Sequence, residues 1–152
     1  MKHGTVKACL LVAGLWAGAA CAQLPLAADR ESVRALRVYR MTTQRMLVAC
    51  SEAIAPRRGV RSAAEALHDY RGCAARALED SGTRLEAVVR TLAAPDPVRA
   101  LREYHLAFTR ALTGLQPQPD ERSSAYEERQ AYLFHRLAHA WARFELADAA
   151  TR

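Results

Sequence analysis

The chain has 152 residues, of which 22 are basic and 16 acidic, and a formal net charge of +6. This length fits a single domain that can bury an apolar core without further support. The most apolar stretch, residues 8–20, is shorter than the ~20 residues that a helix needs to cross a bilayer, which excludes a transmembrane protein.

The first 22 residues have the three parts of a secretory signal peptide. Lys2 and Lys7 make the start positive, residues 8–20 form the apolar part, and Ala20–Ala22 supplies the small residues that a signal peptidase reads. We therefore expect residues 1–22 to be removed and residues 23–152 to form one helical domain. Its expected location is periplasmic or secreted in a bacterium.

Cys21 leaves a second way of processing this segment open. A bacterial lipoprotein keeps such a cysteine and attaches lipid to it, but Gly18 stands where the lipoprotein signal normally has Leu, Val or Ile. We favour cleavage after Ala22 over a lipid anchor. Export in either form makes nucleic acid an unexpected partner.

The remainder of the chain is predicted to be helical throughout. Ala, Leu, Arg and Glu dominate it, and no segment alternates apolar and polar residues as a strand does. Apolar residues instead recur at three-, four- or seven-residue steps in four segments. These predict helices over about 29–55, 62–93, 97–113 and 124–148.

Local signals mark where these helices begin. Ser62 and Glu65 form a capping box at the start of the second helix, and Ser124 with Glu127 suggests another at the start of the fourth. Asp96 is the expected N-cap of the third. The apolar positions of the second helix stay in phase through Ser81-Gly82, so we expect one helix there. With short connections, the expected fold is all-α, an up-down four-helix bundle.

Cys50 and Cys73 are the strongest candidate pair in the chain. Cysteines of exported proteins usually form disulfides, because the compartment is oxidising, and a disulfide between these two would join the first helix to the second. A symmetric hairpin would offset them by about 9 Å along the helix axes, so the bond needs either a late start of the second helix or a skewed connection at residues 56–61. Two free buried thiols are the alternative.

Two surfaces are candidates for binding a partner protein of the cell envelope, and this partner is possibly acidic. The first is the arginine-rich region of residues 29–61, which has an excess of positive charge. Anionic lipid or an envelope polymer could also bind it, and the alternative is that these arginines are only solvated. The second is the outer strip of the fourth helix. The predicted partner-binding residues are Arg34, Arg37, Arg57, Arg58 and Arg61 on the first surface and Tyr132, His139 and Leu146 on the second.

Arginines at seven-residue steps follow the fourth helix, and such a row either is solvated or grips carboxylates or phosphates. The row consists of Arg122, Arg129, Arg136 and Arg143.

The histidines carry the weaker hypotheses. His135 and His139 share a helical face at metal-binding spacing, but the H-E-x-x-H pattern and a third ligand are missing. His105 falls inside an apolar stripe, either as a core histidine or as a haem ligand paired with Met46. We expect neither cofactor nor metal to be bound.

Enzymatic catalysis has no support in the sequence. The serines lack a G-x-S-x-G context, and no glycine-rich phosphate loop is present. We therefore expect a non-enzymatic, exported helical protein that binds a partner protein in the cell envelope, as an inhibitor, an immunity-type protein or an assembly or chaperone factor. The alternative is a haem- or metal-binding periplasmic bundle.

Overall fold

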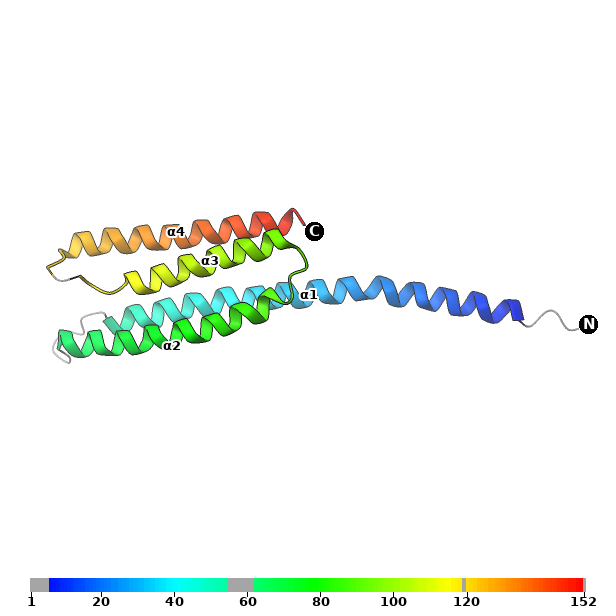
Figure 1. Ribbon diagram of the computed structural model, residues 1–152, viewed down its shortest axis with the longest axis horizontal. Helices are drawn as coiled ribbons and strands as arrows, with labels where there is room; N and C mark the ends of the chain where they lie inside the picture. Colours follow the sequence, from blue (N-terminus) through cyan, green and yellow to red (C-terminus); the bar gives the residue numbers. More distant parts are fainter. Residues whose placement is uncertain (1–5, 55–61, 119, 152) are drawn as a thin grey trace, which may run out of the picture.

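The computed structural model describes the backbone of residues 6–54, 62–118 and 120–151, and the side chains from residue 30 onward within those ranges. All regular structure in these ranges is helical and falls into four helices, as predicted for an all-α bundle. Their bounds are α1 (Val6–Ile54), α2 (Ala63–Val89), α3 (Pro95–Gly114) and α4 (Ser123–Ala149). The helices alternate in direction along the chain (Figure 1).

Helix α1 is much longer than the 29–55 segment predicted for the bundle, because its backbone is helical from Val6 onward. Ala and Leu are strong helix formers, and they carry the helix upstream through residues 8–20. Figure 1 shows this first part of α1 leaving the bundle, so the other helices pack against its second part. Among the described residues, no helix combines the length and the apolar character that crossing a bilayer requires.

Helix α2 follows the prediction most closely. The Ser62 hydroxyl accepts a hydrogen bond from the Glu65 amide at 3.2 Å, and the Glu65 carboxylate accepts one from the Ser62 amide at 2.8 Å. The helix runs unbroken through Ser81 and Gly82, as the phase of its apolar positions predicts. It ends at Val89, somewhat before the expected end.

The starts of α3 and α4 differ from the prediction. Helix α3 begins two residues early, with Ala94 rather than Asp96 at the N-cap, because Pro95 also tolerates the first helical position. Asp96 lies inside the first turn, where a carboxylate favours the helix dipole. Helix α4 begins after Arg122 without any side-chain cap, so the expected Ser124 capping box is wrong.

Tertiary contacts of Arg129 hold the start of α4 in place of that cap. Its guanidinium contacts the Glu121 carboxylate at 2.6 Å and also donates hydrogen bonds to the carbonyls of Gly114 and Gln116. These contacts tie α4 to the turn that follows α3. Only 22% of the Arg129 side chain is exposed, so these bonds are shielded from competing water.

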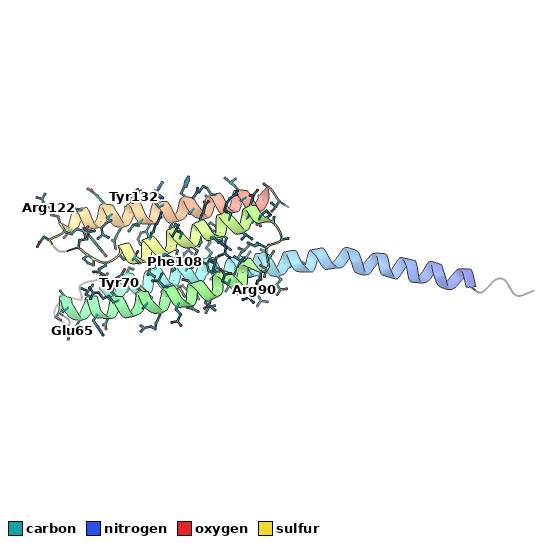
Figure 2. All side chains as sticks on the ribbon, viewed as in Figure 1. Glu65, Tyr70, Arg90, Phe108, Arg122 and Tyr132 are labelled. Carbon is teal, nitrogen blue, oxygen red and sulfur yellow. A yellow bond between two sulfur atoms is a disulfide. The ribbon has the colours of Figure 1, made fainter. Side chains whose placement is uncertain are left out.

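The helices are arranged as two hairpins, α1 with α2 and α3 with α4, and α3 joins them because it contacts all three other helices. The side of α3 that faces the other helices is fully buried, as Phe108 between the two hairpins illustrates (Figure 2). Its members with at most 2% exposure are Pro97, Leu101, Tyr104, Phe108, Ala111 and Leu112.

Polar side chains also cross these helix interfaces. The Thr43 and Tyr104 hydroxyls, from α1 and α3, lie 2.7 Å apart. The Tyr70 hydroxyl of α2 donates to the Leu112 carbonyl of α3, and burial raises the pKa of Tyr70 to about 12, so it stays a donor. Each bond links α3 to a different helix of the other hairpin.

Cys50 and Cys73 are bonded, with their Cα atoms 5.5 Å apart. Cys50 lies about one turn before the end of α1, whereas Cys73 lies nearly three turns after the start of α2. Helix α2 therefore extends about 9 Å further past the disulfide than α1 does. This difference absorbs the offset that a symmetric hairpin would have imposed on the two cysteines.

Replacing both cysteines by alanine should lower the free energy of unfolding by about 3 kcal/mol, because the unfolded chain regains the freedom that the crosslink removes. Chemical denaturation of the exported protein measures this change. Reductant should destabilise the native protein and leave the double variant unaffected. Equal stability of the two proteins, or two free thiols in the denatured native protein, would contradict the disulfide.

Candidate partner-binding groove

A groove of about 700 Å³ runs between α3 and α4. No residue of α1 or α2 lines it, so the groove belongs to the α3–α4 hairpin alone. Tyr132 is on the side of α4 that faces away from the other hairpin (Figure 2). Its lining residues are Glu103, Leu106, Ala107, Arg110, Tyr132, Leu133, His135, Arg136, His139, Ala140 and Arg143.

Two large apolar side chains in this groove are exposed to solvent. Leu106 of α3 is 49% exposed and Tyr132 of α4 is 58% exposed. Leu106 lies out of phase with the buried stripe of α3, so packing against the other hairpin does not explain it. Apolar groups gathered in a hollow with a polar rim are typical of binding surfaces.

The rim of the groove is predominantly positive. It carries the guanidinium groups of Arg110, Arg136 and Arg143 but one carboxylate, that of Glu103. Arg143 pairs with Glu103 at 3.1 Å, and Arg136 donates a hydrogen bond to the Tyr132 hydroxyl at 3.0 Å. Arg110 has no acidic partner within the described part of the chain. Two guanidinium groups are therefore available to an incoming anion.

A second hollow of about 620 Å³ adjoins the groove at the corner between α2 and α3. Glu103 and Leu106 line both, so the two hollows are neighbours along α3, and together they are called the trough below. From Pro95 to Arg110 the trough follows about 22 Å of helix. Its corner end is mainly apolar, with Leu92 and Val98, and the two arginines there, Arg99 and Arg102, are paired with Asp96 and Glu86. Its other end carries histidines and the arginines of the groove.

The structure divides the predicted partner-binding residues between separate surfaces. Tyr132 and His139 line the groove, and Leu146, which is 72% exposed, lies one turn beyond Arg143 on α4. The basic residues of the first surface that are described, Arg34 and Arg37, are exposed on α1. The other three, Arg57, Arg58 and Arg61, lie outside the described residues.

The arginine row of α4 does not act as one unit. Arg129 is anchored to the turn after α3, whereas Arg136 and Arg143 line the groove. Arg122 is exposed at the start of the helix (Figure 2). Of the arginines at seven-residue steps, Arg129 thus has a structural role, and Arg136 and Arg143 belong to the groove.

His105 makes a contact between helices. Its Nδ1 lies 2.7 Å from the hydroxyl of Tyr39 in α1. Burial of the imidazole lowers the pKa of His105; Glu86 raises this pKa by a smaller amount, and Arg102 lowers it further. Met46, its hypothetical haem-binding partner, packs against the core. The hydrogen bond to Tyr39 accounts for the position of His105 without any cofactor.

His135 and His139 both line the groove, on the exposed side of α4. Within the described ranges, no three His, Cys, Asp or Glu side chains come together in a way that could hold a metal ion. The two imidazoles are better placed to donate hydrogen bonds to a ligand of the groove, alongside Arg136.

The α3 half of the groove was missing from the sequence prediction. The sequence could have indicated that Leu106 and Arg110 are exposed side by side, since both lie opposite the apolar stripe of their helix and are one turn apart. That they face Tyr132 and Arg136 follows from the packing of α3 on α4, which the pattern of a single helix does not specify.

Comparison of the chain with protein-family models, with curated proteins and with solved structures finds no match.

The buried imidazole of His105 should make stability depend on pH. Burial puts its pKa in the folded protein below the ordinary 6.5, so the unfolded chain takes up a proton first as pH falls. The free energy of unfolding should therefore decrease as pH is lowered through about 6.5, and level off once the folded protein is also protonated.

Denaturation at several pH values measures this dependence. His105→Gln should remove the His105 contribution, whereas His135→Gln, at an exposed position, should retain it. A His105→Gln variant with the full pH dependence of the native protein would contradict the assignment.

Proposed function

We propose that this chain is an exported, non-enzymatic helical protein that binds an acidic segment of a partner protein in the bacterial cell envelope. The observation that carries the proposal is the groove between α3 and α4, where exposed Leu106 and Tyr132 lie between arginines. The signal-like residues 1–22 and the Cys50–Cys73 bond support export, because disulfides persist in oxidising compartments.

Charge and shape indicate what kind of segment the groove accepts. Arg110 and Arg136 offer planar guanidinium groups that bind carboxylates in a bidentate manner. Leu106 and Tyr132 offer apolar area between them, and aromatic side chains and arginine are enriched where proteins bind one another. The expected ligand is a segment in which acidic and apolar residues lie close together.

The length of the trough extends this description. About 22 Å of α3 accommodates some four turns of a partner helix. The apolar corner beside Val98 would take the apolar end of that segment, and the arginine end would take its acidic side chains. An inhibitor, an immunity-type protein and an assembly or chaperone factor would all use a surface of this kind.

Site-specific photocrosslinking in intact cells tests the proposal. A photoreactive amino acid at Leu106 should form an adduct with one exported protein, whereas the same group at Glu79, exposed on α2, should not. Reversing Arg110 and Arg136 to glutamate should remove the adduct, because the pair would then repel an acidic segment and weaken binding by roughly 100-fold.

Two controls separate loss of binding at the groove from loss of folding and from a change in overall charge. Far-ultraviolet circular dichroism should show the reversed variant to be as helical as the native protein. Reversal of exposed Arg90 with Arg122 is the second control, because it changes the net charge equally elsewhere. Loss of the adduct in both the Arg110–Arg136 and the Arg90–Arg122 reversals would show that overall charge, and not the groove, is responsible. No protein adduct from Leu106 in the native protein would overturn the proposal.

A further inference from the structure

The outer side of α1 is a second unpartnered surface, independent of the groove. It carries apolar side chains that are about half exposed, with Val38 at 48%, Met41 at 44% and Val48 at 56%. Arg34 and Arg45 are exposed on the same side of the helix. The buried residues of α1 face the other way, toward α2 and α3, so nothing in the described structure covers this side.

The charge of this surface has one sign. Arg34, Arg37 and Arg45 are exposed between residues 34 and 48, and this stretch contains no acidic residue. None of the three side chains forms an ion pair within the described part of the chain. The guanidinium groups and the apolar side chains alternate over about 21 Å of one helical ridge.

We propose that this ridge, the outer side of α1 from Arg34 to Val48, lies on the surface of an anionic phospholipid bilayer. Helices that lie at a membrane surface combine an apolar stripe with basic side chains, which reach the phosphate groups while the apolar groups enter the headgroup region. Each arginine near an anionic leaflet strengthens the attraction. The ridge supplies both parts of this pattern on one exposed side of α1.

Continuity with residues 8–20 favours a bilayer over an acidic protein as the occupant. That apolar stretch belongs to the same helix, and the ridge begins about 21 Å after its end. The membrane that receives residues 8–20 as a signal peptide before cleavage, or a lipid on Cys21 if that cysteine is kept, would therefore bring the ridge close to phosphate groups. The groove of α3 and α4 is lined by other residues and stays available to a protein.

Vesicle co-sedimentation tests the proposal. Full-length chains carrying Cys21→Ser, which excludes a lipid anchor, are exported and purified, and mass spectrometry establishes that they share one N-terminus. They should bind vesicles of phosphatidylglycerol with phosphatidylethanolamine and bind phosphatidylcholine vesicles far more weakly. Added salt should weaken the binding to the anionic vesicles.

Two sets of substitutions separate the two parts of the ridge. Arg34→Glu with Arg37→Glu and Arg45→Glu should weaken binding to anionic vesicles by roughly 100-fold or more. Val38→Gln with Met41→Gln and Val48→Gln should weaken it by about 10-fold, since the apolar contacts with the bilayer are lost. Circular dichroism is the control for folding, and both variants should be as helical as the native protein.

A matched control reverses Arg71, Arg90 and Arg122, which are exposed outside α1 and outside the groove, so it gives the same net charge and leaves both surfaces unchanged. This control should retain most of the binding. Equal loss in the control and in the α1 reversal would show that overall charge alone is responsible and would overturn the proposal. Absence of binding to anionic vesicles, or full binding by the glutamine variant, would overturn it as well.

Discussion

Burial of the apolar side of α3 is the constraint on which the rest of this structure depends. The chain forms two helical hairpins, and α3 is the helix that contacts α1, α2 and α4. Leu101, Phe108 and Leu112 have no exposed surface. Each buried side chain of this size contributes about 1.5–3 kcal/mol of transfer free energy. Without this contact, the disulfide-linked α1–α2 hairpin would be held to the other hairpin mainly by Arg40, which pairs with Glu145 and lies over the Trp141 ring of α4.

Polar contacts fix how the hairpins meet. Apolar packing is non-directional, whereas a buried hydroxyl requires a partner at a defined place. Thr43 with Tyr104 and Tyr39 with His105 set α3 against α1, and Tyr70 sets it against α2. No buried side-chain polar atom in the described part of the molecule lacks a partner. One arrangement of the hairpins therefore satisfies both the apolar and the polar requirements.

The same packing decides which surfaces are left for binding. With Phe108 turned inward, Leu106 and Arg110 face outward on α3, where α4 brings Tyr132 and Arg136 beside them. On α1, the inward position of Tyr39 leaves the Arg34–Val48 ridge outside. The first surface is a groove between two helices and the second is one exposed side of a single helix, which agrees with the proposals of a protein segment at the first and a bilayer at the second.

Much of this architecture is visible in the sequence, because it arises from local periodicity. The phase of the apolar residues predicts an unbroken α2 through Gly82, and Ser62 with Glu65 predicts where it begins. The prediction failed where tertiary contacts outweigh local signals. Arg129 holds the start of α4 by bonds to the preceding turn, which made the Ser124 capping box unnecessary.

The groove was predicted only in its α4 half. Tyr132 and His139 stand out on their own helix, but their neighbours Leu106 and Arg110 come from another helix. Which residues of two helices face one another depends on how the helices dock, and the apolar period of each helix leaves that open. A polar network such as Tyr39 with His105 is hidden for the same reason, because its partners are far apart in the chain.

The role of α3 is tested most directly by comparing two truncations on this helix, Phe108→Ala and Leu106→Ala, by equilibrium denaturation. Phe108 is fully buried between the hairpins and Leu106 is half exposed in the groove. We predict that Phe108→Ala lowers the free energy of unfolding by about 3–5 kcal/mol, while Leu106→Ala changes it by about 0.5 kcal/mol or less. Equal and small losses for the two variants would contradict the central role of α3.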